Sequence, residues 1–253
     1  MPVPAIPRTE ADLVEIFSSI QGEGLLVGCR QIFLRFAGCN LACRYCDTDF
    51  SRRANCQIED PPGSGQLQSF SNPVALDPIV ELVRKWLKAA PGAYHSLSLT
   101  GGEPLLQADV LQTWLPELRR LLPIYLETNG TLPEQLEILL PHLDWISLDL
   151  KLQSVAGQPT DWDSHHLFLQ RAGRTNCYVK MVVGEETPDA ELRRGAELVA
   201  SVSADIPLIL QPVTVAGLIT LTTSRMLDMQ QVVAALHGNV RIIPQTHRFL
   251  GLL

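Results

Sequence analysis

Two kinds of hydrophobic pattern alternate along the chain. Residues 31–36 place Ile32, Leu34 and Phe36 at every second position, the period of a β-strand with one buried face. Residues 77–90 instead repeat apolar side chains every three or four positions, as an amphipathic helix does. By the same criteria we expect further strands at residues 96–100, 124–127, 145–150, 177–183, 207–210 and 240–243, and further helices at 108–122, 133–140, 187–202 and 224–236.

Strands that alternate with helices predict a mainly parallel sheet, either doubly wound or curved into a barrel. Polar residues follow the C-terminal ends of several predicted strands, at residues 100–104, 127–130, 151, 211–212 and 245–247. Barrel active sites use that end of many strands, whereas an open sheet gathers its site at one switch point. We therefore predict an α/β fold with a partial (β/α) TIM-like barrel, built as one domain over residues 1–253.

Composition limits the remaining possibilities. Residues 51–72 are rich in Pro, Gly, Ser and Gln, and we expect a long polar loop insertion there, either a lid or a disordered segment. The chain has 20 Lys and Arg against 27 Asp and Glu, a net charge of −7, which argues against a broad nucleic-acid surface. No stretch is as long and apolar as a membrane span, and residues 1–7 do not resemble a signal peptide, so we expect no membrane partner.

Cys39, Cys43 and Cys46 have the spacing C-x3-C-x2-C. Three thiolates this close can bind one iron–sulfur cluster of four irons, which leaves one iron open for chemistry. A structural zinc site is the main alternative, with Cys56 or Cys29 as the fourth ligand. A disulfide framework is disfavoured because six cysteines are few for this length and three of them are clustered. Since thiolate ligands need a reducing compartment, we expect the protein to be cytoplasmic.

The cysteine spacing resembles the signature of the radical S-adenosylmethionine (SAM) enzymes, and this resemblance implies a partial barrel of the radical SAM type. The run 101–104, Gly-Gly-Glu-Pro after a predicted strand, resembles the second motif of that superfamily, whose glycines approach the amino group of SAM. Residues 15–24, 33–40, 46–48, 127–130 and 245–248 resemble the 7-carboxy-7-deazaguanine synthases. The matches run from residue 15 to the C-terminus.

The resemblance implies a lyase that converts 6-carboxy-5,6,7,8-tetrahydropterin to 7-carboxy-7-deazaguanine, with ring contraction and loss of ammonia, on the way to queuosine and other 7-deazapurines. It implies one [4Fe–4S] cluster, SAM as a reusable radical source and Mg²⁺. A flavodoxin or ferredoxin type electron donor and a homodimer are implied as partners. Water and side chains quench such radicals, so the site has to be closed.

The resemblance also assigns roles to residues. The cluster ligands are Cys39, Cys43 and Cys46, and Thr48 is the magnesium contact, the alternative being a hydroxyl that caps a turn. The implied SAM contacts are Tyr45, Thr100, Gly101, Gly102, Glu103, Glu127, Asn129, Asp149 and Lys151. The implied substrate contacts are Ile20, Gln21, Gly22, Glu23, Arg35, His247 and Leu253, the last through the end of a C-terminal tail that completes the site. No side chain is expected to be a dedicated acid or base.

Some assignments also follow from residue chemistry. Arg35 lies opposite the apolar face of its strand, so it points into the barrel, where a substrate carboxylate or an internal partner, Glu23 or Glu127, would pair with it. The amide of Gln21 and the carboxylate of Glu23 match the donors and acceptors of a pterin edge, unless both are solvated turn residues. Lys180 is expected either to face inward or to pack its stem on apolar neighbours.

Two alternatives and one departure stay open at this point. An activase that abstracts hydrogen from a glycine of a partner protein shares the cysteines and the Gly-Gly-Glu-Pro run, but does not account for residues 21, 23, 35 and 247 together. A non-catalytic module held by zinc is the alternative from another class. Where the family has Ser-Pro-Lys at a strand end, this chain reads Asp149-Leu150-Lys151, so the serine contact to SAM is missing.

Overall fold

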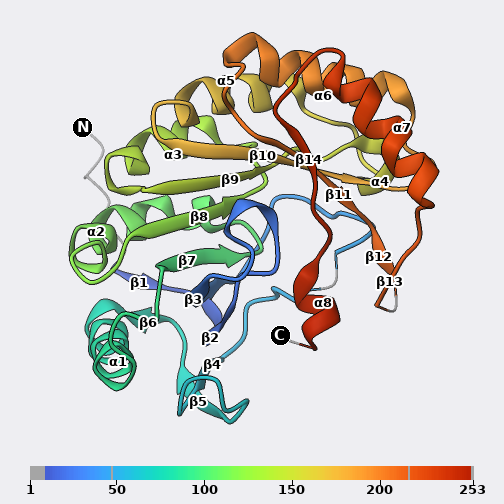
Figure 1. Cartoon of the computed structure of the whole chain (residues 1–253). Helices are drawn as coiled ribbons and strands as arrows, with labels where there is room; N and C mark the ends of the chain where they lie inside the picture. The colour runs from blue at the N-terminus through green and yellow to red at the C-terminus, as the bar shows by residue number, and fades with distance from the viewer. Residues whose placement is uncertain (1–8, 47, 216, 252–253) are drawn as a thin grey trace, which may run out of the picture.

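A computed structural model describes residues 9–46, 48–215 and 217–251, and its elements follow the predicted alternation (Figure 1). The strands are β1 (Glu10–Ala11), β2 (Leu13–Ile20), β3 (Arg30–Phe36), β4 (Asn55–Glu59), β5 (Leu67–Ser71), β6 (Val74–Ala75), β7 (Ser96–Gly101), β8 (Ile124–Thr128), β9 (Trp145–Asp149), β10 (Asn176–Val183), β11 (Leu208–Pro212), β12 (Thr214–Val215), β13 (Leu218–Ile219) and β14 (Val240–Ile242). The α-helices are α1 (Leu76–Ala89), α2 (Ala108–Leu118), α3 (Pro133–Leu139), α4 (Gln153–Ala156), α5 (Trp162–Ala172), α6 (Asp189–Val202), α7 (Thr223–Ala234) and α8 (Thr246–Leu250). Short 3-10 turns are η1 (Gly24–Leu26), η2 (Pro104–Gln107) and η3 (Leu140–His142).

The main sheet has ten strands among the described residues, in the order β14-β11-β10-β9-β8-β7-β3-β2-β4-β5. From β3 to β14 the neighbours are parallel and lie side by side in chain order. A doubly wound sheet would reverse its strand order at a switch point. No reversal occurs between β3 and β14, and β14 and β5 are the two edges of the sheet, so the predicted partial barrel is confirmed.

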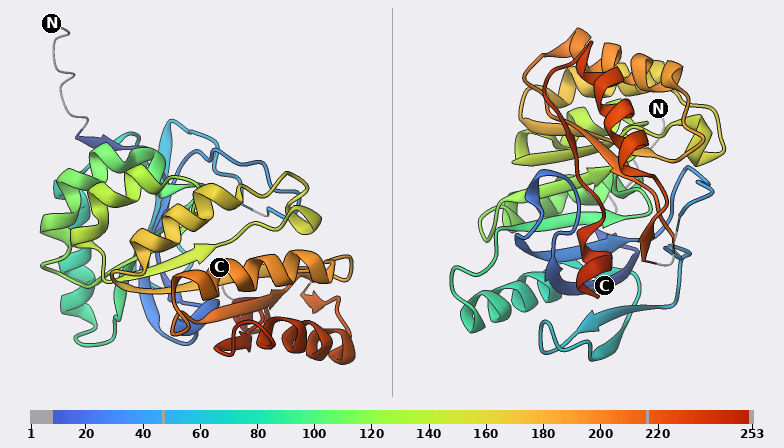
Figure 2. Two further views of the ribbon diagram at one scale, coloured as in Figure 1. Left: turned by 90° about the horizontal axis from the view of Figure 1, so that it is seen from above. Right: turned by 45° about the vertical axis from the view of Figure 1, so that its right-hand side comes forward.

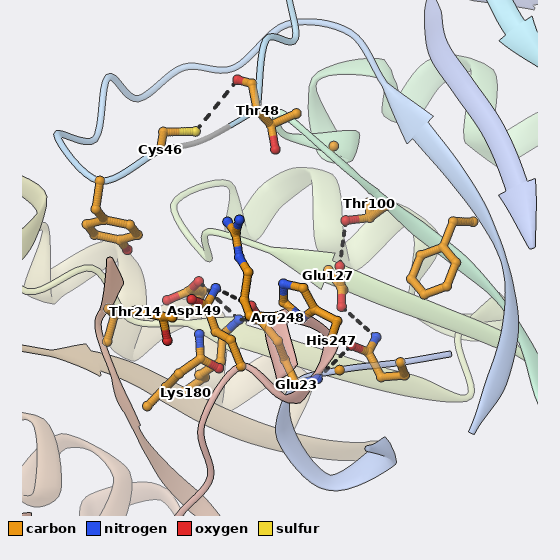
Figure 3. A pocket seen from close by; sticks show the side chains of 18 of the residues that line it. Glu23, Cys46, Thr48, Thr100, Glu127, Asp149, Lys180, Thr214, His247 and Arg248 are labelled. Atoms are coloured by element: carbon orange, nitrogen blue, oxygen red, sulfur yellow. Dashed lines mark hydrogen bonds and ion pairs between the residues drawn. The ribbon is translucent and has the colours of Figure 1, made fainter. Parts of the chain in front are cut away.

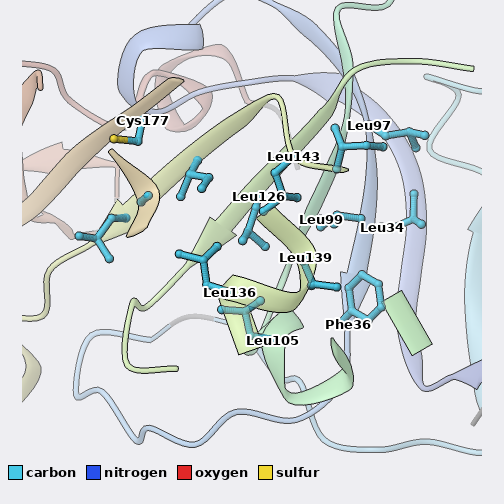
Figure 4. Packing of buried hydrophobic residues seen from close by; sticks show 14 of the residues in the cluster. Leu34, Phe36, Leu97, Leu99, Leu105, Leu126, Leu136, Leu139, Leu143 and Cys177 are labelled. Carbon is cyan, nitrogen blue, oxygen red and sulfur yellow. The ribbon is translucent and has the colours of Figure 1, made fainter. Parts of the chain in front are cut away.

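Helices cover the outer face of the parallel strands. Helices α2, α3, α5, α6 and α7 contact one another in that order, and Figures 1 and 2 show them as an arc outside the sheet. Right-handed crossovers between strands added in one direction place every helix on the same face. The side chains of β7 show the result, since Leu97 and Leu99 belong to the hydrophobic core under the helices (Figure 4). Ser98 and Thr100 occupy the alternate positions, which face the interior of the barrel, and are also buried.

A turn closes the N-terminal end of the barrel. Because β2 pairs antiparallel with β3, with Ile20 opposite Arg30, the turn between them lies at the end where the parallel strands begin. We call residues 21–29 the plug turn. Its Leu26 packs inside the barrel against Tyr125, Tyr178 and Ile209.

The C-terminal segment docks on the plug turn. The backbone N–H and the hydroxyl of Thr246, at the start of α8, both donate to the carbonyl oxygen of Gly22, at 2.8 and 3.0 Å. A side chain at Gly22 would overlap His247, so the glycine allows this close approach. The tail therefore lies where the interior of the barrel would otherwise open.

The prediction of a long polar loop at residues 51–72 is wrong. Strands β4 and β5 form an antiparallel hairpin in this segment, and β4 extends the main sheet through β2. Cys56 and Ile58 alternate into the core, while Gln57 between them is half-buried. The carboxylate of Glu59 accepts hydrogen bonds from the backbone N–H groups of Ser18 and Gly65. The polar composition masked a strand whose apolar residues occupy only one face.

Two of the longer elements, β2 and α5, were also not predicted. Strand β2 is mostly buried on both faces, so its sequence lacks the polar–apolar alternation of a half-buried strand. Helix α5 begins after Asp161, whose carboxylate caps the backbone N–H of Ser164. Within the described residues, no helix combines the length and the apolar character that crossing a bilayer requires.

The hairpin predicts a stability difference between two substitutions. Ile58→Ala should lower the free energy of unfolding by about 2–4 kcal/mol, because it leaves a cavity in the core. Phe70→Ala, on the exposed strand β5, should change it by less than about 0.5 kcal/mol. Urea denaturation of both variants measures the difference. Equal effects would mean that residues 51–72 do not pack as a hairpin.

Candidate active site

Two adjoining cavities occupy the barrel interior. The first, the large cavity, has a volume of about 500 Å³, within the range of small-molecule sites. The second, the cysteine cavity, measures about 140 Å³ and is lined by Cys39, Cys43 and Cys46. The residues that line both cavities are Tyr45, Cys46, Thr100, Gly101, Glu127, Asp149, Lys151 and Lys180.

The three cysteines lie on the loop that follows the C-terminal end of β3. Burial raises the pKa of the Cys39 and Cys43 thiols, so a bound cation would be needed to hold them as thiolates. Among residues 9–46, 48–215 and 217–251, no three His, Cys, Asp or Glu side chains are close enough to hold one metal ion. A cubane cluster differs in its demands, because each thiolate binds a different iron. Three cysteine sulfurs are the donor set that such a cluster takes, so the chemistry of these residues fits it.

The zinc alternative needs a fourth thiolate, and neither candidate lines the cysteine cavity. Cys56 is fully buried in the core under β4. Cys29 packs against the apolar residues around the plug turn. The structure therefore gives neither Cys56 nor Cys29 a role as a ligand at the cysteine cavity.

The backbone of residues 101–103 lies against the start of the cysteine loop. The N–H of Gly102 donates to the carbonyl of Phe36 at 3.1 Å, and that of Glu103 to the carbonyl of Gly38 at 2.8 Å. A side chain at Gly102 would overlap the Gly38 carbonyl, and Gly101 has a φ of +124°, which other residues rarely adopt. The glycines thus bring this strand end up to the loop, and both line the cysteine cavity.

Glu103 was predicted to contact SAM, but its side chain lines neither cavity. It is fully buried and accepts hydrogen bonds from the backbone N–H groups of Leu105 and Asn129 and from the hydroxyl of Thr128. Burial raises the pKa of this carboxyl to about 7, although the three donors favour its ionised form. In the structure Glu103 orients Asn129, which does line the cysteine cavity.

A buried ion-pair network forms the wall of the large cavity nearest the plug turn (Figure 3). Lys180 of β10 pairs with Glu23 and lies 3.5 Å from Asp149, and Lys151 donates to Asp149 at 2.7 Å. Gln245 donates to the other oxygen of Glu23 at 2.8 Å. Of the two expectations for Lys180, the inward-facing one is confirmed.

These contacts fix the charges of the network. Burial alone would raise the pKa of Glu23, but the charge and hydrogen bond of Lys180, with the Gln245 amide, lower it to about 2. Burial likewise disfavours the charged forms of Lys180 and Lys151. The neighbouring carboxylates Glu23 and Asp149 outweigh it, so both lysine pKa values lie above the usual range. Glu23, Lys180 and Lys151 are therefore charged at neutral pH.

Gln21 reaches from the plug turn to β8. Its amide donates to Glu127 at 2.8 Å and to Gln31 at 3.0 Å, and its oxygen accepts the N–H of Glu23. The second oxygen of Glu127 accepts the hydroxyl of Thr100 at 2.5 Å. Gln21 and Glu127 both line the large cavity, and this network fixes which of their atoms face it.

Arg35 lines the large cavity, as its predicted orientation requires. The internal partners considered for it, Glu23 and Glu127, are wrong: its Nε donates to Glu15 at 2.6 Å. Glu15 lies directly opposite Arg35 in the pairing of β2 with β3, and β2 was not predicted as a strand. The guanidinium lies over Phe17, whose ring stacks on that of Phe33 at 4.9 Å between centroids.

Residues 21, 23, 35 and 247, which separated the synthase from the activase, all line the large cavity. Ile20 and Gly22 line it as well. Leu253 lies outside the described residues, and the contact predicted for it stays a prediction. Thr48 also lines the large cavity.

The site also contains residues to which the sequence assigned no contact with a ligand. Gln211 is the next-to-last residue of β11 and Thr214 begins β12, while Lys180 lies within β10 and Gln245 precedes α8. All four line the large cavity. The sequence indicates these residues only by their position at or near strand ends. To predict that they line the cavity, one has to know how the C-terminal tail docks on the barrel.

Several buried oxygens of the wall have no hydrogen-bond partner within the described part of the chain, among them Asp149 Oδ1, Gln211 Oε1 and Thr214 Oγ1. Buried polar atoms without partners are costly. Because all three residues line the large cavity, a ligand with donor groups would satisfy them. The site therefore fits a polar organic ligand next to a cluster.

Comparison with known proteins agrees with this geometry. The sequence profile of the radical SAM superfamily matches residues 34–152. The 7-carboxy-7-deazaguanine synthase of Geobacter sulfurreducens is 49% identical over 245 residues, covering 96% of this chain and 98% of the relative. That of Methanothermobacter thermautotrophicus is 37% identical over 261 residues, with coverages of 96% and 98%.

Solved structures support the same fold. QueE from Escherichia coli matches with a TM-score of 0.56 at 20% identity, covering 95% of this chain and 96% of that one. Streptococcus suis SuiB bound to S-adenosylmethionine matches with a TM-score of 0.53 at 16% identity, covering 86% and 52%. Together with the near full-length similarity to the curated synthases, these findings show that the chain belongs to the 7-carboxy-7-deazaguanine synthase family of the radical SAM superfamily.

Proposed function

We propose that this protein is a radical SAM carbon–nitrogen lyase that converts 6-carboxy-5,6,7,8-tetrahydropterin to 7-carboxy-7-deazaguanine, with ring contraction and loss of ammonia. The observation that carries the proposal is that the cysteine cavity and the large cavity adjoin each other and have lining residues in common. A radical generated on one side can meet a substrate on the other without crossing bulk water, which would quench it. The family membership supplies the identity of the substrate.

The cysteine cavity would hold the cofactors. Cys39, Cys43 and Cys46 would bind a [4Fe–4S] cluster, which when bound supplies the electron that cleaves SAM reductively. Gly101 and Gly102 present backbone to the cavity, where a ligand can approach closely. Asp149 offers a buried oxygen that has no hydrogen-bond partner among the described residues and is suited to an ammonium or hydroxyl donor. Lys151, charged at neutral pH, is suited to the SAM carboxylate.

The large cavity would hold the pterin. The stacked rings of Phe17 and Phe33 form an apolar wall for a flat heterocycle. The guanidinium of Arg35 uses one N–H for Glu15 and has others to donate to the substrate carboxylate. Glu23, ionised down to about pH 2, accepts hydrogen bonds from the ring edge. Gln21, His247 and the end of the tail would complete the contacts.

The remaining elements of the proposal rest on family resemblance. Mg²⁺ would bind Thr48 and substrate oxygens, since magnesium takes oxygen ligands and keeps waters. A flavodoxin or ferredoxin would supply the electron, and two copies would form a homodimer. A thiolate-bound cluster is consistent with a cytoplasmic location.

One prediction of this proposal concerns turnover. Anaerobically reconstituted protein with SAM, reductant, Mg²⁺ and the carboxypterin should form 7-carboxy-7-deazaguanine, detected by mass and absorbance. Cys43→Ala should abolish it, because a cluster ligand is lost, whereas Cys29→Ala should retain it. SAM cleavage without product would keep the radical chemistry and reject the substrate. Neither activity from cluster-loaded protein would reject the function.

Another prediction of this proposal concerns Arg35. Arg35→Gln should raise KM for the carboxypterin by about 10- to 100-fold, the equivalent of one charge-assisted hydrogen bond of about 1.5–3 kcal/mol. Arg30→Gln, on the same strand but outside both cavities, should leave KM within about twofold of the parent. SAM cleavage in the absence of substrate should persist in both. Equal KM values for the two variants would contradict the assigned role.

A further inference from the structure

The cysteine loop (residues 38–46) rests on the connection between β9 and α5 (residues 150–161). The backbone N–H of Arg44 donates to the carbonyl of Ala156 at 2.9 Å, and its guanidinium donates to the carbonyl of Ser154 at 2.7 Å. Ser154 is in turn held by the carboxylate of Glu191 on α6. The connection is therefore a fixed support for the loop.

One side chain of this support contacts a cysteine sulfur. Gly157 adopts a left-handed φ of +77° at the end of α4 and turns the chain, and Gln158 follows it. The amide oxygen of Gln158 accepts the backbone N–H of Ala42 at 3.4 Å, and its Nε2 donates to Cys43 Sγ at 3.5 Å. A single amide thus fixes the loop backbone and the adjacent sulfur together.

We propose that Gln158 is a positioning residue that holds Cys43 for the cluster and raises the reduction potential of that cluster; this inference rests on the proposed binding of a cluster by the three cysteines. Reduction adds one electron, and part of the added charge resides on the thiolate sulfurs. A hydrogen bond donated to a sulfur stabilises the reduced form more than the oxidised form. Gln158 therefore makes it easier for an electron donor to load the cluster.

The other sulfurs have different surroundings. Cys39 accepts from the backbone N–H of Leu41 at 3.4 Å, a contact built into the loop itself, and from Asn129 at 3.9 Å. The donor to Cys43, like Asn129, comes from a distant segment, here 115 residues along the chain, and it is closer to its sulfur, at 3.5 Å. A substitution at residue 158 consequently removes one sulfur contact without changing the loop sequence.

The test uses Gln158→Met, which keeps the side-chain length and removes the N–H donor. The control is Gln170→Met, an exposed glutamine of α5 that contacts His166 and neither cavity. The midpoint potential of the cluster is measured by redox titration with EPR. At a fixed solution potential, Gln158→Met should lower the ratio of reduced to oxidised cluster by about three- to tenfold, the latter being a shift of about 59 mV for one electron. The control should stay within about twofold, or about 18 mV.

A second readout uses the metal-free protein. Because Gln158 accepts the N–H of Ala42, hydrogen exchange at that amide should be faster in Gln158→Met than in the parent and in Gln170→Met. If Gln158→Met holds no cluster, faster exchange at Ala42 supports the positioning role and unchanged exchange overturns it. If it holds a cluster with an unshifted potential, the inference is overturned while the proposed function stands. A parent protein that binds no cluster overturns both.

Discussion

The ion pair between Lys180 and Glu23 joins parts of the molecule that are far apart in the sequence. Lys180 belongs to a central strand, Glu23 to the plug turn, and Gln245 brings the C-terminal tail to the same carboxylate. Removing such charges from water is costly, and only close pairing with further hydrogen bonds offsets the cost. The pair therefore keeps the plug turn and the tail in place, since either partner alone would be a buried charge without its main counter-ion.

Because the barrel is open, its interior has to be covered by segments outside the parallel strands. Its parallel strands bring the cysteine loop and the two glycines to one end, as their order in the sheet requires. The plug turn and α8 cover the opposite side, where the sheet itself supplies no wall. The large cavity lies between these two sets of segments. At one end it meets the backbone of the Gly101–Gly102 segment, and at the other it meets charged side chains that hold one another in place by ion pairing.

The sequence predicted what depends on local pattern. The alternation of Ile32, Leu34 and Phe36 placed the strand and the inward direction of Arg35 correctly. It did not reveal Glu15 as the partner of Arg35, because β2 is buried on both faces and shows no alternation. The hairpin at residues 51–72 was hidden by polar composition. Gln158 and Gln245 depend on contacts between distant segments, which no local pattern encodes.

The most direct test of the ion-pair account is a double-mutant cycle on the free energy of unfolding, with Glu23→Gln, Lys180→Met and the double variant. Each single substitution leaves a buried charge without its main partner and should cost about 3 kcal/mol or more. The double variant should cost less than the sum of the two by about 1–3 kcal/mol. Additivity within about 0.5 kcal/mol would contradict the claim that this pair holds the plug turn and the tail around the site.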